Sequence, residues 1–174
     1  MASKKTSIFT LTERLTLDDT NTTFATIDLG SYVDVGDRQA LQVHSVEFIF
    51  QGTDPAGSAV VALASGGSVL VQVTDLNRGA LVFADDRSLV SSAELTFDQG
   101  GFLSQNMDMY PDNFGKGSDD GRYVVNDQLY IVGRSTSVAP GQAVNVTIRV
   151  NASIVSLTAK DFMAIAIQST AADN

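Results

Sequence analysis

The chain of 174 residues contains no cysteine and no tryptophan, and its only histidine is His44. Without cysteine there are no disulfides, no thiolate metal ligands and no cysteine nucleophiles. One histidine also rules out metal sites that take two or three imidazole ligands from a single chain. Enzyme classes that depend on these groups are therefore excluded.

Lysine and glutamate are scarce as well. The chain has four Lys and three Glu but 17 Asp. Glutamate favours helices, whereas aspartate favours turns and caps, and exposed helices normally use both Glu and Lys. The composition therefore predicts an all-β protein with aspartate-rich loops.

Long apolar runs and an excess of positive charge are also missing. No apolar run reaches the roughly 18 residues of a membrane span, and the basic start at residues 1–7 is not followed by the apolar stretch of a secretory signal. We therefore expect synthesis in the cytoplasm. The net charge of −9 argues against a broad nucleic-acid-binding face, and Lys4 and Lys5 are too few for strong phosphate binding.

The clearest positive signal is an alternation of apolar and polar residues. Between positions 144 and 154 every even-numbered residue is apolar and every odd-numbered one is polar, as in a strand with one buried face. At His44-Ser45 the alternation changes phase, which predicts a β-bulge. Related patterns predict strands at 8–17, 23–29, 40–51, 59–63, 69–74, 122–125 and 128–133, and shorter, weaker ones at 81–83 and 89–97.

Near the C-terminus, residues 157–161 fit a single helical turn, and 162–167, apolar on both faces, predict a buried central strand. The fold class expected is all-β: an antiparallel β-sandwich of about eight principal strands, of jelly-roll type. It forms one domain, 1–174, with a flexible arm at 1–7 and a tail at 169–174. The residues predicted to lie in its core are Phe48, Phe50, Val146, Ile148, Val150, Ile165 and Ile167.

Residues 98–121 break the strand pattern. Connections longer than roughly 12–15 residues are usually functional or disordered, and this one is rich in large apolar side chains of the kind found in interface cores. We predict that the segment forms a subunit interface, the alternative being a lid over its own sandwich. The residues expected in the interface are Phe102, Leu103, Met107, Met109, Tyr110 and Phe114.

Chemistry-bearing groups are few. His44 could act as a base or pH sensor, but a lone histidine without a nucleophile motif favours a polar residue on a sheet face. The adjacent carboxylates at 18–19, 85–86 and 119–120 fit solvated turns better than a glycosidase pair. We predict no catalytic, cofactor or metal site; the oxygen-rich side chains between 106 and 120 lack EF-hand spacing, although a cation shared between subunits stays open.

The basic start at Lys4-Lys5, the eight or so strands, the long insertion and the last strand ending near Gln168 together resemble the single jelly-roll capsid proteins of icosahedral viruses, over residues 8–168. The resemblance implies a non-enzymatic shell subunit of the virion. Such subunits form pentamers, hexamers or trimers with copies of themselves and contact other virion proteins. Many capsid proteins that package genomes directly carry a long arm rich in Arg and Lys, and the short arm of this chain departs from that pattern. In this respect the chain is more like the subunits of shells that enclose an internal membrane or another protein layer, or like a minor virion component.

Two other functions remain as alternatives. Jelly-roll sandwiches also serve as carbohydrate- or ligand-binding modules, although the tryptophan that often forms their binding platform is absent. Cupin-like enzymes share the strand pattern but need several histidines around a metal. Because one fold hosts many functions, the fold cannot decide among them.

Overall fold

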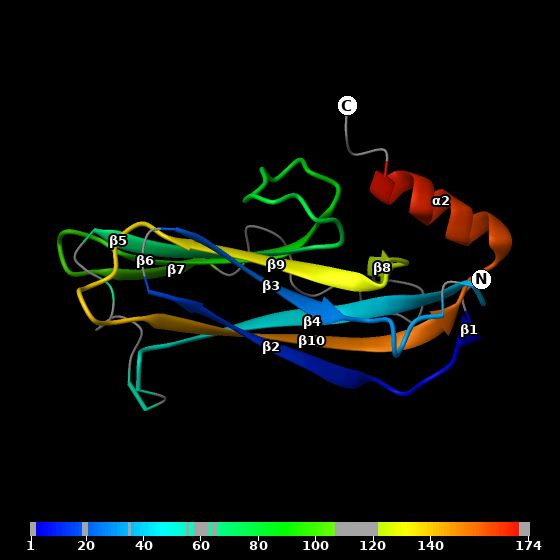
Figure 1. Cartoon of the computed structure of the whole chain (residues 1–174), viewed down its shortest axis with the longest axis horizontal. Coiled ribbons are helices and arrows are strands. Elements are labelled where there is room, and N and C mark those ends of the chain that lie inside the picture. Colours follow the sequence, from blue (N-terminus) through cyan, green and yellow to red (C-terminus); the bar gives the residue numbers. More distant parts are fainter. Residues whose placement is uncertain are drawn as a thin grey trace.

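Two antiparallel sheets and one helix make up the described part of the computed structural model, which comprises residues 3–18, 21–34, 36–54, 56–57, 63, 66–106 and 122–170. The sheets lie one above the other, and the helix lies at one end (Figure 1). The elements are β1 (Ser3–Lys4), β2 (Phe9–Leu17), β3 (Thr22–Asp28), β4 (Gln39–Gln51), β5 (Gly67–Thr74), β6 (Leu89–Phe97), β7 (Leu103–Asn106), β8 (Arg122–Val124), β9 (Gln128–Ser135), β10 (Val144–Ser156) and α2 (Ala159–Thr170).

The strand order is that of a jelly roll. One sheet runs β2-β10-β4-β8, with β1 also pairing β10, and the other runs β3-β9-β5-β6-β7. The pairs β2–β10, β3–β9, β4–β8 and β5–β6 are nested along the chain, as if one long antiparallel hairpin had been wrapped around a barrel. The predicted all-β sandwich of jelly-roll type is confirmed.

The core lies between the two sheets and follows the alternation of the sequence. Val146, Ile148 and Val150 on β10 are fully buried, and Phe48 on β4 is buried beside them, as predicted. Phe50 is only partly buried and packs against the edge of this cluster. Burying one such aliphatic side chain contributes roughly 1.5–3 kcal/mol, so this layer supplies much of the driving force for folding.

Gly133 on β9 lies directly against side chains of the opposite sheet. A β-carbon at this position would collide with Leu15 Cδ2 on β2 and would also crowd Leu17 and Val71. Only glycine leaves room for Leu15 there, because protein interiors have no spare space for an added methyl group. The sequence gives no sign of this requirement.

The predicted strand at 162–167 is wrong: these residues belong to helix α2. Thr158 caps the helix, because its Oγ1 accepts a hydrogen bond from the Asp161 N–H (3.2 Å) and donates one to Asp161 Oδ2 (2.8 Å). Phe162, Ile165 and Ala166 pack inward against Ala40, Val125, Val155 and Leu157 in a second, smaller cluster. Ile165 and Ile167 therefore lie outside the sandwich core, and Ile167 is exposed.

The predicted bulge at His44 is confirmed. The pairing of β4 with β10 shifts between Asn151 and Ala152, which lie opposite Ser45 and Val43, so His44 is the additional residue. The His44 Nε2 lies 2.9 Å from Ser153 Oγ. Burial, helped by the nearby charge of Lys4, lowers the pKa of His44, as expected for a neutral polar residue on a sheet face.

Other segments differ from the prediction in detail. Within the expected arm, Ser3–Lys4 form a strand against β10, and within the expected loop 98–121, β7 pairs with β6. Residues 81–83 form no strand. Leu63 pairs with Val138, while 59–62 lie outside the described residues.

Candidate functional site

The hairpin between β6 and β7 presents the first two predicted interface residues to solvent. Phe102 is 74% exposed and Leu103 is 52% exposed. The other four, Met107, Met109, Tyr110 and Phe114, lie outside the described residues, as do Asp108, Asp112, Asn113, Asp119 and Asp120 of the oxygen-rich stretch. The contact of this segment with a partner thus stays a prediction.

A tight turn holds Phe102 in its exposed position. The Gly101 N–H donates to the Asp98 carbonyl (3.2 Å), the Asp98 N–H donates to the Phe102 carbonyl (3.0 Å), and the Phe102 N–H donates to Asp98 Oδ1 (2.9 Å). Gly101 has φ of +84°, a conformation that residues with a side chain rarely adopt. The backbone of this turn is therefore fixed by its own hydrogen bonds, and the phenyl ring projects from it.

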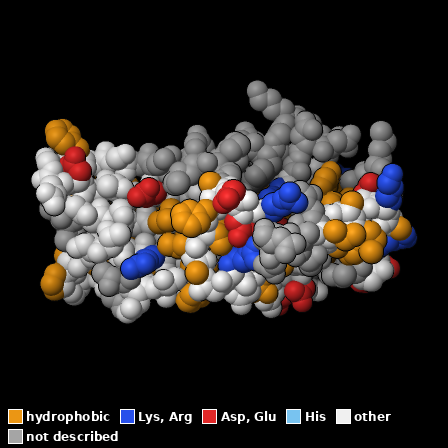
Figure 2. Space-filling view, turned by 90° about the horizontal axis from the view of Figure 1, so that it is seen from above, with side chains coloured by type: hydrophobic (Ala, Val, Ile, Leu, Met, Phe, Trp, Pro, Cys, Tyr) orange, Lys and Arg blue, Asp and Glu red, His pale blue; other side chains and the backbone are white. Residues whose placement is uncertain are grey.

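Helix α2 exposes a second apolar surface at the opposite end of the sandwich. Met163 and Ile167 are 58% and 59% exposed and lie four residues apart, hence on one face of the helix. Figure 1 places α2 and the β6–β7 hairpin at opposite ends of the long axis. Figure 2 shows hydrophobic side chains in one group near the middle of the upper face and in another toward the end that carries α2, with charged side chains between them.

A shallow apolar groove of about 280 Å³ lies on the outer face of the sheet that contains β3 and β9. Phe24 and Thr26 on β3 and Tyr130 and Val132 on β9 form its floor, and Asn77 and Gly79 in the loop between β5 and β6 form a wall. The pairing of Thr26 with Tyr130 and Phe24 with Val132 places these side chains next to one another. The groove can accept an apolar side chain or a small ring.

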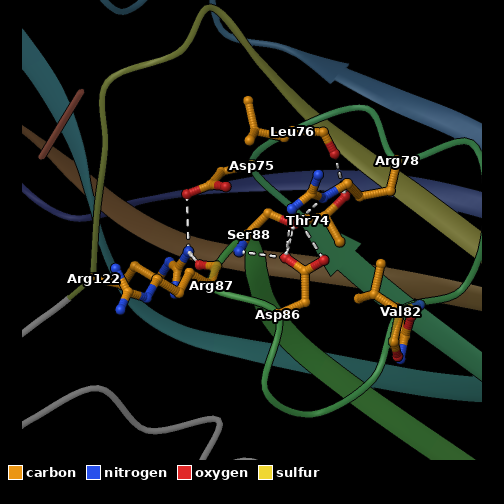
Figure 3. Close-up of polar contacts among 10 residues, drawn as sticks. Thr74, Asp75, Leu76, Arg78, Val82, Asp86, Arg87, Ser88 and Arg122 are labelled. Carbon is orange, nitrogen blue, oxygen red and sulfur yellow. Dashed lines mark hydrogen bonds and ion pairs between the residues drawn. The ribbon is translucent and has the colours of Figure 1, made fainter. Parts of the chain in front are cut away.

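The loop between β5 and β6 is anchored by two ion pairs (Figure 3). Arg122 Nη2 lies 2.9 Å from Asp75 Oδ2 and also donates to the Arg87 carbonyl. Burial raises the pKa of Asp75 above its ordinary value, and the charge of Arg122 and its hydrogen bond only partly oppose this effect.

The second ion pair joins Arg78 and Asp86 at 3.1 Å. The Ser88 hydroxyl and N–H both donate to Asp86 Oδ1, at 2.6 and 2.8 Å. Burial alone would raise the pKa of Asp86, but the hydrogen bonds from Ser88 and the contacts with Arg78 outweigh it and hold the pKa below its ordinary value. Each carboxylate is thus paired with its own arginine, and the cluster fixes the loop over the sheet.

The acidic side chains that the sequence offered as metal ligands or catalytic pairs form no such site among the described residues. In the part of the chain that the structure describes, no three His, Asp or Glu side chains are close enough to bind a metal ion. Asp86 of the pair 85–86 is an anchor of its loop, and Asp19, Asp119 and Asp120 lie outside the described residues. No helix there has the length and hydropathy needed to cross a membrane.

Sequence reasoning missed the groove and the exposed face of α2. The signal for α2 was present, because Phe162, Ile165 and Ala166 have the three-to-four-residue spacing of a helix face. The signal for the groove was weaker. Phe24 lies in the outward phase of its strand between Thr22 and Thr26, and only the β3–β9 pairing shows that it adjoins Tyr130.

No protein-family model and no curated protein matches this sequence. The chain is similar to the solved structure of Merkel cell polyomavirus VP1 in complex with 3'-sialyllactosamine (8% identity, TM-score 0.45, 90% of this chain and 98% of that chain). It is also similar to Trichodysplasia spinulosa-associated polyomavirus VP1 in complex with 3'-sialyllactose (11% identity, TM-score 0.47, 90% of this chain and 97% of that chain). A third similar structure is that of turnip yellow mosaic virus (13% identity, TM-score 0.33, 90% of this chain and 99% of that chain). All three are structures of viral proteins, and each match extends over 90% of this chain at 8–13% identity.

Proposed function

We propose that this chain is a structural protein that assembles with copies of itself, as a capsid subunit of an icosahedral virus. Its location would then be the virion, and its partners would be identical subunits and other virion proteins. The observation that carries the proposal is the exposure of large apolar side chains at both ends of the jelly roll. Phe102 and Leu103 lie at one end, and Met163 and Ile167 lie at the other.

Two apolar surfaces at opposite ends suit a subunit that contacts different neighbours on each side. Large apolar patches are rare on monomeric proteins and usually mark interaction surfaces. Contacts between unlike surfaces of identical subunits generate closed rings when the rotation between subunits closes. Covering an exposed phenyl, leucyl or isoleucyl group contributes at most about 1.5–3 kcal/mol to association, in proportion to the area removed from water.

The segment 98–121 extends the first of these surfaces in the proposal. Its two described apolar residues, Phe102 and Leu103, are exposed, and Met107, Met109, Tyr110 and Phe114 add to the contact with a neighbour. Aromatic residues and methionine are enriched in interface cores. In the alternative, a lid over its own sandwich, the segment would stabilise the monomer instead.

The test is assembly of the purified protein, followed by sedimentation and electron microscopy. Closed shells or rings are expected, and a monomer at every concentration would contradict the proposal. In the double variant Phe102→Asp/Leu103→Asp, two charges replace the exposed apolar surface at the β6–β7 hairpin. We expect this variant to remain folded, with an unchanged melting temperature in dilute solution, and to lose assembly.

A matched control adds the same kind of charge elsewhere. Thr12 is exposed in the middle of β2, away from both ends of the sandwich. Thr12→Asp should assemble normally. If the hairpin variant melts at lower temperature at every protein concentration, the hairpin covers its own core and the lid alternative is correct.

The groove beside β3 favours a second candidate function, a carbohydrate- or ligand-binding module. Phe24 and Tyr130 present aromatic surfaces there, and the adjacent Thr26 and Asn77 offer polar groups. Sugars stack on aromatic rings while their hydroxyls bond to such polar neighbours. A stable monomer that binds a glycan array, with binding abolished by Tyr130→Ala, would support this function.

A further inference from the structure

Strand β3 is an edge of its sheet, and no described strand pairs with its free side. Its seven residues, Thr22–Asp28, contain no lysine, arginine or proline and pair with β9 in a continuous register without a bulge. The other edges in the described part of the chain are protected: β7 and β8 are short, and β2 carries Glu13 and Arg14. Sheet proteins normally blunt their edges with such devices, because a free edge can pair with another chain.

The backbone groups on the free side of β3 can be assigned from its pairing. The Leu29 N–H donates to the Asp127 carbonyl (2.8 Å), and backbone hydrogen bonds alternate along an antiparallel strand. The peptide groups of odd-numbered residues therefore face β9. Those of the even-numbered residues, Thr22, Phe24, Thr26 and Asp28, face away from it, and no described strand pairs with them.

We propose that this edge pairs with the same edge of a second copy of the chain across a two-fold axis at Ala25. The two five-stranded sheets would then join into one continuous sheet (β3 lies beside β9 in the upper sheet of Figure 1). The inference deepens the proposed function and rests on it in one respect, since it identifies one of the contacts through which subunits associate.

The sequence of β3 is complementary to itself in this register. A two-fold axis at Ala25 pairs all seven residues, whereas any other two-fold register leaves some of them unpaired. Ala25 meets the partner's Ala25 at the axis, in a pair without hydrogen bonds, where Cα atoms approach to roughly 4.5 Å and small side chains fit best.

Charge also favours a second copy of the chain as the occupant. The protein carries a net charge of −9, so an interface between identical chains must avoid placing carboxylates opposite each other. The only charged residue of β3 is Asp28, and in this register it lies opposite the partner's Thr22. No like charges face each other along the pair, and closure by a two-fold axis limits the association to two copies.

The same register covers exposed apolar surface. Phe24 is 53% exposed and lies opposite the partner's Thr26, on the outer face that also carries the groove. Aromatic and β-branched residues directly across an antiparallel pair contact each other favourably. The pairing thus buries part of Phe24 and extends the wall of the groove beside Thr26.

The absence of cysteine permits a direct test with one substitution. In Ala25→Cys the two thiols would face each other across the axis, within the Cα separation that a disulfide requires. Oxidation should give a disulfide-linked dimer on a non-reducing gel. In the control Thr23→Cys, which has the same orientation in β3, the thiols would lie roughly 13 Å apart, and no link should form. Equal linking in both, or none in Ala25→Cys, would overturn the register.

A second test removes the edge hydrogen bonds without disturbing β9. The Thr26 N–H faces the free edge, where proline is tolerated in natural sheets. Thr26→Pro should raise the dimer dissociation constant at least tenfold in sedimentation equilibrium, while Thr26→Val, which keeps the N–H, should leave it unchanged. Circular dichroism and melting of both variants in dilute solution verify folding. Equal dissociation constants would contradict the edge pairing.

The failure of this inference can be distinguished from that of the proposed function. Shells that form without an Ala25→Cys crosslink would support the function and overturn the edge pairing. A crosslinked dimer that never forms shells would support the edge pairing and contradict the function. A protein that stays monomeric at all concentrations would overturn both.

Discussion

Arg122, at the start of β8, lies 2.9 Å from Asp75, the residue that follows β5, and this contact ties together the ends of strands from different sheets. Asp75 is almost fully buried, whereas the side chain of Arg122 is about one quarter exposed. Asn126 also donates to the Asp75 carbonyl, so the chain before β9 is tied to the same residue. The loop between β5 and β6 is thereby held next to the chain that enters β8.

We predict that Arg122→Ala destabilises the protein by about 3 kcal/mol, because it leaves the buried carboxylate of Asp75 without its cation. Urea denaturation measures the change. The double variant Asp75→Leu/Arg122→Leu should recover most of the loss, since it removes both charges. If the double variant lost as much stability as Asp75→Leu and Arg122→Leu combined, the pair would not be coupled.

A pH-dependent prediction concerns Asp86. Its pKa is lower in the folded protein than its ordinary value of 3.8, so the ionised carboxylate stabilises the fold above that value and this contribution disappears as the pH falls through the folded pKa. The difference in unfolding free energy between wild type and Asp86→Asn should therefore shrink as the pH drops below about 4. Ser88→Ala, which removes one of the donors to Asp86, should show the same trend to a smaller extent.

Ile148→Ala should cost roughly 2–5 kcal/mol, because it creates a cavity in the layer between the sheets. Thr147→Ala, on the opposite face of β10, should cost much less. Chemical denaturation of the two variants gives both values. Similar and small shifts of the two midpoints would contradict the burial of Ile148.

Gly133→Ala should destabilise the protein by about 1–3 kcal/mol, since the added methyl group collides with Leu15. Combining it with Leu15→Ala provides the control. If the collision causes the loss, the double variant should be more stable than the sum of the two single effects predicts. Thermal melting of all three variants tests this non-additivity.

The sequence predicted the strands well where one face of the strand is buried and the other is exposed to solvent. The alternation from Val144 to Ile154 gave β10, and the phase change at His44 gave the bulge, because both follow from the two-residue period of a strand. The helix α2 was mistaken for a strand. Met163 and Ile167 make its exposed face apolar as well, so the helical spacing of Phe162, Ile165 and Ala166 did not stand out.

The candidate sites depended on pairing between distant segments, which no local pattern reveals. The groove exists because Phe24 lies beside Val132 and Thr26 beside Tyr130, and the ion pair Asp75–Arg122 joins residues 47 positions apart. Phe102 and Leu103 were predicted as interface residues from their apolar character alone. The structure shows that both side chains are exposed, while their contact with a partner stays a prediction.

The position of β10 between β2 and β4 has a consequence for how the protein is made. Thr10 and Asn151, which are hydrogen-bonded across β2 and β10, are separated by 141 residues. During synthesis, β2 and β4 therefore leave the ribosome long before the strand that joins them exists, and that sheet can form only once the chain has been translated to about Ser156. Domains dominated by such distant pairings fold slowly, in milliseconds to seconds. Surfaces that depend on this sheet are therefore absent from nascent chains that have not yet been extended to β10.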